Sequence, residues 1–102
     1  MKTVRKTWGH EDWLVYNDKY CLKKLYINTE QSTSLKSHTL KKKTLFLEEG
    51  LVDLLVNEER ILLEEGYAYT IDPEDVYSLI AYKDSILLEV SSIDVEDVMV
   101  RI

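Results

Sequence analysis

The sequence predicts an all-β domain, a sandwich or a barrel, and three observations support this fold class. Apolar runs of about five to eight residues recur along the chain, and short polar or glycine-containing clusters separate them. The runs are rich in Tyr, Leu, Ile and Val, which suit a pleated surface. Short strands at this spacing are typical of sandwiches and barrels. The chain of 102 residues is long enough for a single domain, residues 1–102, with one core.

The expected strands lie between turn signals that follow each other in a regular order. The signals are residues 17–18, 28–31, 48–50, 57–59, 64–66, 72–75 and 83–85. Before the third signal, Leu45 and Leu47 alternate with Phe46, as in a strand. After the fifth signal, the runs AYTI, VYSLIAY and SILLEVS combine β-branched and aromatic residues. We therefore expect strands from the N-terminus to the end of the last run.

Residues 51–66 allow two interpretations. Leu51, Leu54, Leu55 and Ile61 have spacings that an amphipathic helix could use, and Leu and Glu are good helix formers. However, glycines bracket the segment, and the polar cluster at 57–59 divides it into two equal runs. Each run suits one arm of a hairpin, so a β-hairpin is favoured over the helix.

The net charge of −6 is unevenly spread along the chain. Residues 1–43 carry +6 and residues 44–102 carry −12. A net acidic chain argues against binding a nucleic-acid backbone, which needs a basic surface. The consecutive Lys41 and Lys42 are interpreted as a solvated turn, whereas Lys43 begins the alternating apolar stretch.

The sequence also predicts where the protein resides. No run approaches the roughly 20 apolar residues that a membrane span requires. The residues after Met1 contain no apolar segment typical of a signal peptide. Cys21 is the sole cysteine, so it cannot form an internal disulfide, and we expect a buried, inert thiol. Together these features predict a soluble protein of the reducing cytoplasm.

Two glycines, Gly50 and Gly66, anchor a motif spacing in the middle of the chain. Counting back from Gly50, Lys43 lies seven residues earlier, His38 twelve and Lys36 fourteen. In this spacing the sequence resembles the cupins, small RmlC-like barrels whose first motif is G-x5-H-x-H-x3,4-E-x6-G. Lys36 and His38 stand at the two histidine positions, and Lys43 stands at the glutamate position.

The second cupin motif, G-x5-P-x-G-x2-H-x3-N, starts at Gly66. Its histidine position then holds Tyr77, and Pro73 comes one residue late. The Trp8–Gly9 opening is similar to that of mannose-6-phosphate isomerase-type cupins. The resemblance covers roughly residues 7 to 91 and implies a double-stranded β-helix, the jelly-roll barrel of the cupins.

The resemblance implies a divalent metal (Zn, Mn, Fe or Ni), but the substitutions argue against one. Lys36 and Lys43 are protonated near neutral pH, offer no lone pair, and would repel a cation. His38 and Tyr77 alone cannot replace a set of three or four ligands. We therefore expect no metal and no other cofactor, since His38 is the sole matching ligand position.

Lys36 and His38 are two residues apart and share one face of a strand. In the jelly-roll pattern this face points into the barrel lumen, where a lysine must be compensated. Two alternatives stay open. In the first, the lysines pair with acidic residues of the later sequence: Glu89, Asp72 or Glu74. In the second, four lumen residues bind a ligand's phosphate or carboxylate: Lys36, His38, Lys43 and Tyr77.

Two functions from different classes follow. The favoured one is a non-catalytic module that binds a sugar or another small anionic molecule. The alternative is a sugar-phosphate or sugar-nucleotide isomerase or epimerase, as the opening implies, in which Lys36 or Lys43 acts as a base. We also expect a homodimer. Trp8 and Trp13 are its candidate interface residues, with plain core packing as the other interpretation.

Overall fold

A computed structural model describes residues 1–92 and 98–99, and every regular element within them is a β-strand. The strands are β1 (Lys2–Lys6), β2 (Gly9–Tyr16), β3 (Tyr20–Ile27), β4 (Lys36–Ser37), β5 (Lys43–Glu49), β6 (Val52–Val56), β7 (Glu59–Leu63), β8 (Ala68–Ile71), β9 (Tyr77–Ala81), β10 (Ser85–Ser92) and β11 (Val98–Met99). Within this described part, no helix is long and apolar enough to cross a lipid bilayer.

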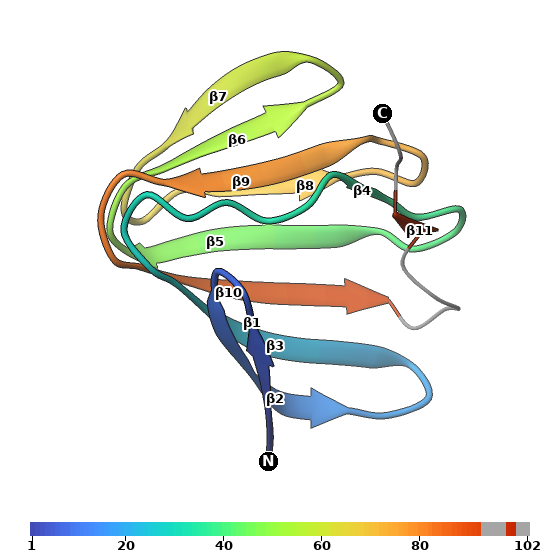
Figure 1. Ribbon diagram of the computed structural model, residues 1–102. Coiled ribbons are helices and arrows are strands. Elements are labelled where there is room, and N and C mark those ends of the chain that lie inside the picture. The colour runs from blue at the N-terminus through green and yellow to red at the C-terminus, as the bar shows by residue number, and fades with distance from the viewer. Residues whose placement is uncertain (93–97, 100–102) are drawn as a thin grey trace.

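The strands form two antiparallel sheets that enclose the core (Figure 1). The six-stranded sheet has the order β1-β2-β3-β10-β5-β8, and the five-stranded sheet has the order β11-β4-β9-β6-β7. Neighbouring strands come from distant parts of the chain, because β10 lies between β3 and β5, and β9 lies between β4 and β6. The all-β, jelly-roll prediction is confirmed.

The hairpin interpretation of residues 51–66 is confirmed as well. β6 pairs with β7 from Val52 opposite Leu63 to Val56 opposite Glu59. The two residues that join the strands, Asn57 and Glu58, have φ angles of 48° and 72°. Positive φ at both positions defines a type I′ turn, whose twist matches that of the paired strands. The alternative of a helix over this segment is wrong. β6 also pairs with β9, so sheet hydrogen bonds satisfy the backbone groups on both edges of β6.

The hydrophobic core lies between the sheets and takes side chains from both. Its fully buried members come from alternate positions of the strands: Ile27, Leu45, Leu47, Val52, Leu54, Ile71, Leu79, Ala81 and Leu87. Burying one such leucine or isoleucine side chain contributes about 1.5–3 kcal/mol relative to leaving it in water. The core is therefore the main source of stability in this fold.

Gly50 occupies the corner at which the chain leaves the six-stranded sheet for the five-stranded one. Its φ angle is 113°, and a Cβ atom at this position would lie 2.2 Å from Ser85 Oγ. Both the backbone conformation and the close approach therefore require glycine. The glycine that anchors the motif spacing is therefore required at position 50 for steric reasons.

The structure corrects one sequence-based interpretation and decides between the two alternatives of another. Lys41 is buried, so the prediction of a solvated turn is wrong for Lys41 and holds for the exposed Lys42. The carboxylate of Glu89 interacts electrostatically with Lys41, which supplies the physical reason for its burial. Trp8 is 5% exposed and belongs to the hydrophobic core, so core packing, one of its two interpretations, is what the structure shows.

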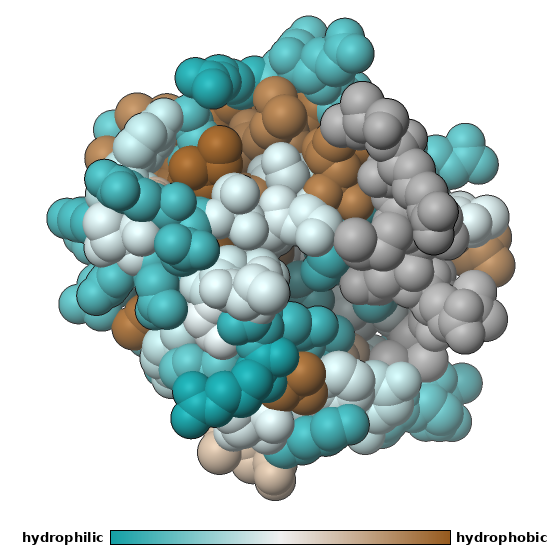
Figure 2. Space-filling view, in the orientation of Figure 1, coloured by the Kyte–Doolittle hydropathy of each residue, from teal (hydrophilic) through white to brown (hydrophobic). Residues whose placement is uncertain are grey.

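Hydrophilic side chains cover much of the surface shown in Figure 2. Hydrophobic side chains gather on this face over β6, β7 and β9. Leu62 of β7 is 52% exposed and marks the outer side of that hairpin.

Candidate functional site

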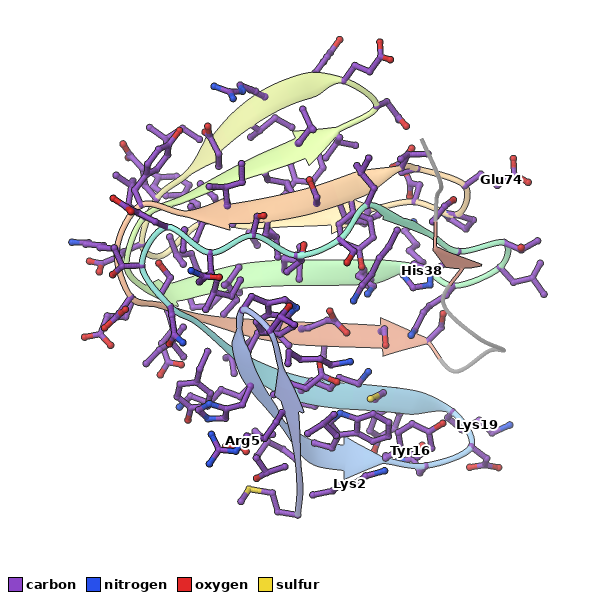
Figure 3. All side chains as sticks on the ribbon, viewed as in Figure 1. Lys2, Arg5, Tyr16, Lys19, His38 and Glu74 are labelled. Carbon is purple, nitrogen blue, oxygen red and sulfur yellow. The ribbon has the colours of Figure 1, made fainter. Side chains whose placement is uncertain are left out.

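The predicted lumen residues His38, Lys43 and Tyr77 come together inside one end of the barrel. Lys43 opens β5 opposite Ser91 of β10, and Tyr77 opens β9 opposite Lys36 of β4. His38 follows β4 and lies among the strand ends rather than on the outer surface (Figure 3). His38, Lys43 and Tyr77 are each at most 3% exposed, so they form a buried cluster.

Strand alternation explains why a lysine enters the barrel at this point. In β5 the buried residues are Lys43, Leu45 and Leu47, while Thr44 and Phe46 face outward. A residue in register with two core leucines must share their side of the sheet. The sequence therefore forces the Lys43 ammonium group into the lumen.

A continuous chain of polar contacts connects the cluster. Lys43 Nζ donates a hydrogen bond to Tyr77 Oη at 2.6 Å and lies 3.2 Å from Glu89 Oε1. Tyr77 Oη lies 3.3 Å from Nε2 of His38. Because the tyrosine oxygen accepts from Lys43, its own proton can be donated to the histidine nitrogen. Glu89, Lys43, Tyr77 and His38 thus form one linked acid–base network.

Opposing effects set the charge state of Glu89. Its burial pushes the pKa of the carboxyl group upward, but the ammonium groups of Lys43, Lys23 and Lys41 together outweigh this effect. The pKa of Glu89 is consequently held below its usual range, and the carboxylate is ionised at neutral pH. The buried charge is stable only because its cations are close.

A second buried pair extends the network toward β2. Lys23 Nζ lies 3.9 Å from Glu11 Oε1, and the indole Nε1–H of Trp13 donates to the same oxygen at 2.8 Å. The Lys23 ammonium group also lies 4.4 Å from the centre of the Trp13 ring, within cation–π range. Lys23 stands directly opposite Glu89 in the β3–β10 pairing, so the two pairs are adjacent.

The structure assigns partners to the acidic residues that were candidates for internal pairing. Glu89 pairs with Lys43, as the first alternative predicts. Asp72 instead lies 3.5 Å from the exposed Lys42, and the backbone N–H of Glu74 donates to the carbonyl of His38. Lys36 is half-buried. The binding of a ligand by Lys36, His38, Lys43 and Tyr77 remains a prediction.

Sequence reasoning missed the Glu11–Lys23 pair. In β3 the alternate residues Cys21, Lys23, Leu25 and Ile27 are buried, so strict alternation would have placed Lys23 inside. The adjacent Lys24 obscured this pattern, because two consecutive lysines look like a solvated segment.

Cys21 is a free, buried thiol, and burial raises its pKa, which suits an inert core position.

The donor set does not fit the metal that the resemblance implies. Among the described residues, no three His, Cys, Asp or Glu side chains gather in a group that could hold a metal ion. The glutamate position holds Lys43, which already donates to Tyr77 and pairs with Glu89. An ammonium group is a donor with no lone pair for a metal. The expectation that no metal binds here remains a prediction.

No protein-family model matches the chain, and no curated protein matches it.

Comparison by structure gives strong matches to solved structures, two of which are named as cupins. An RmlC-like cupin from Shewanella frigidimarina superposes with a TM-score of 0.84 at 16% identity, covering 93% of this chain and 86% of its own. KdgF from a Halomonas species gives 0.79 at 11% identity, with 85% and 80% covered. A cupin superfamily protein from Desulfitobacterium hafniense gives 0.76 at 12% identity, with 82% and 76% covered.

These matches define the class of fold. The chain has the jelly-roll fold of the RmlC-like cupins over most of its length. At such low identity the likeness concerns the fold alone, and the same scaffold carries many activities. The function must therefore be argued from the residues in the lumen.

Proposed function

We propose that this protein is a metal-independent, non-catalytic cupin that binds a small polar molecule, a sugar or a small anion, in its barrel lumen. The observation that supports the proposal is the buried network of Glu89, Lys43, Tyr77 and His38 at the cupin site position. A fold that needed only stability would be served as well by apolar side chains there, since buried ion pairs add little net stability. We infer that these polar groups are retained for a ligand.

The polar groups of the lumen suit either candidate ligand, a hydroxyl-rich sugar or a small anion. Glu89 pairs with Lys43 and Glu11 accompanies Lys23, and Lys41 and Lys36 are further cations at this end of the barrel. Ser91 adds a further polar group, because its buried hydroxyl has no hydrogen-bond partner among the described residues. Hydroxyl groups of a sugar both donate and accept, and could exchange hydrogen bonds with Tyr77, His38 and Ser91.

A thermal-shift assay with a panel of neutral sugars, sugar phosphates and small carboxylates tests this proposal. A ligand at ten times its Kd should stabilise the folded state by about 1.4 kcal/mol, which corresponds to several degrees in Tm for a domain of this size. Tyr77→Phe removes a single hydroxyl from the network and should abolish most of the shift, as should Lys36→Ala. Tyr82→Phe is the matched control, since Tyr82 is exposed and bonds to Asp53 outside the lumen.

Three outcomes would contradict the proposal. The first is a shift that survives Tyr77→Phe and Lys36→Ala unchanged. The second is a stoichiometric transition metal found by elemental analysis of protein purified without a metal-affinity tag. The third is a panel without any shift at millimolar ligand.

A sugar-phosphate isomerase or epimerase is the second candidate. It is favoured by the hydrogen-bonded sequence of Glu89, Lys43, Tyr77 and His38, since such a relay could move a proton to or from a bound carbonyl compound. Proton NMR in D2O distinguishes the two functions. An isomerase would exchange the proton next to the carbonyl of its sugar phosphate, whereas a binding protein would only broaden the ligand signals.

A further inference from the structure

A groove opens in the side of the barrel, between the last strands of the two sheets. Within residues 1–92 and 98–99, β7 ends the five-stranded sheet, β8 ends the six-stranded sheet, and neither pairs with the other. The groove between them has a volume of about 270 Å³. We call it the seam groove, and its lining includes Ile61, Leu62, Glu64, Tyr67, Ala68 and Tyr69.

The seam groove exposes side chains that belong to the core. Ile61 stands opposite Leu54 of β6, and Tyr69 stands opposite Leu45 of β5. Leu54 and Leu45 are 0% exposed, whereas Ile61 and Tyr69 are half-buried although both pack against the core. Tyr67, which is 64% exposed, adds a large aromatic ring to the lining. A further strand laid along the groove would therefore complete the burial of this part of the core.

The outer edge of β7 is an unprotected strand edge. Among the described strands, β6 is its sole neighbour, and β11 lies at the opposite edge of the same sheet. β7 pairs with β6 without a bulge and ends in three apolar residues, Ile61–Leu63. An edge of this kind presents a row of backbone N–H and C=O groups to another chain. By contrast, three of the five residues of the edge strand β1 are cations, which deter such pairing.

Exposed carboxylates stand at both ends of β7. Glu58 and Glu59 lie at its start, and Glu64 follows its last residue. Arg60, the cation of β7, lies 3.7 Å from Asp53, so a carboxylate already offsets its charge. A partner that runs along β7 therefore meets a negative potential, and basic side chains would complement it.

Two other kinds of occupant suit the groove less well. A small molecule usually takes a pocket of about 300–1,000 Å³ that buries most of its surface, whereas the seam groove is smaller and open along a strand edge. A second copy of the chain could offer its basic edge strand β1, but Val4 is the sole apolar residue of that strand. An extended peptide can be apolar on one face and basic on the other, because its successive side chains alternate.

We propose that the seam groove binds an extended peptide segment of a partner protein, in which apolar and basic residues alternate. The peptide adds to the free edge of β7 as a further strand, through backbone hydrogen bonds. Its apolar side chains pack on Ile61, Tyr67 and Tyr69, and its basic side chains lie near Glu59 and Glu64. None of the described lumen residues lines the groove, so this site is independent of the proposed sugar or anion site.

Fluorescence anisotropy with a labelled octapeptide of alternating lysine and valine tests this proposal. The peptide should bind saturably to the full chain, and added salt should weaken the binding, because the carboxylates are exposed. Tyr67→Ala should weaken it at least about tenfold, since it removes a large aromatic contact. Tyr20→Ala is the matched control, because Tyr20 is 54% exposed but lies on β3. Circular dichroism and Tm establish that each variant is folded.

Two altered peptides separate the parts of the proposed contact. Methylation of the backbone nitrogens of a central lysine and the adjacent valine blocks both edges of the strand, because consecutive N–H groups point to opposite edges. This peptide keeps its side chains and should bind at least about tenfold more weakly, since it loses backbone hydrogen bonds to β7. A peptide of alternating glutamate and valine should not bind, because like charges repel.

Amide hydrogen exchange locates the bound peptide, and exchange should slow in β7, Glu59–Leu63, when the peptide binds. Absence of saturable binding at millimolar peptide would overturn the proposal. Equal binding of either altered peptide, or protection of β1 instead of β7, would also overturn it. Self-association of the chain without peptide, abolished by Tyr67→Ala, would overturn it in favour of a second copy in the groove.

Discussion

The two ends of the barrel interior differ sharply, although the same three strands build both. At one end, β3, β5 and β10 contribute Leu25, Leu47 and Leu87, which stand in one row across the sheet. Two residues further along β10, the inward row contains Lys23 of β3 and Glu89 of β10. A chain can therefore pass from a dry core to a charged network within one strand, provided that the charges come in pairs.

The comparison shows that stability and candidate function have separate locations in this fold. The apolar end holds the sheets together by burial of leucine and isoleucine side chains. At the polar end the charged side chains pair with one another and add little net stability to the fold. This end is therefore the part of the interior that can serve a ligand.

The largest expected effect comes from breaking the pair at the polar end. Glu89→Leu leaves the ammonium groups of Lys43 and Lys23 without their shared carboxylate, and should lower the free energy of unfolding by about 3–5 kcal/mol. Urea denaturation measures the loss. The double variant Lys43→Met with Glu89→Leu should regain most of it. A double variant as unstable as the single one would show that the pair is not the cause.

Truncation at the apolar end should cost slightly less. Leu47 is fully buried, and Leu47→Ala should reduce the free energy of unfolding by about 2–5 kcal/mol, through lost burial and a residual cavity. Unlike Glu89→Leu, this change has no compensating partner, and its effect should not vary with pH. A cost below about 1 kcal/mol in urea denaturation would mean that the sheets collapse around the gap.

The smallest effect is the acid dependence of Glu89. Its pKa in the folded state lies below its usual range because of the nearby lysines. Glu89 therefore stabilises the fold above the unfolded-state pKa of about 4.3, and this contribution is lost as the pH falls through the lower folded-state pKa. Glu89→Gln should flatten the decline of Tm as the pH falls below the unfolded-state pKa of glutamate. A decline as steep as in the wild type would assign it to other carboxylates.

Much of the fold could be predicted because local signals agreed with it. The polar residues Asn57 and Glu58 predicted the turn of the hairpin. Gly50 anchored the motif spacing and lies at a corner where a Cβ atom cannot fit. Burial of Lys43 followed from its register with Leu45 and Leu47. Each of these inferences depends only on neighbours in the sequence.

The parts that could not be predicted depend on contacts between distant strands. Lys41 and Lys23 each stand beside another lysine, and the carboxylates that accompany them inside the barrel, Glu89 for both and Glu11 for Lys23, come from other strands. Trp8 was ambiguous for a similar reason, because its place in the core is fixed by strands that follow much later in the chain. A single sequence does not show which residues of distant strands lie next to each other in the fold.

The Lys43–Glu89 pair also constrains how this protein can evolve. A descendant that acquired glutamate at position 43 would face Glu89 across a gap now spanned by a cation, and the two like charges would repel in a region shut off from water. Building an ion-binding site in this barrel would thus demand simultaneous change at several positions.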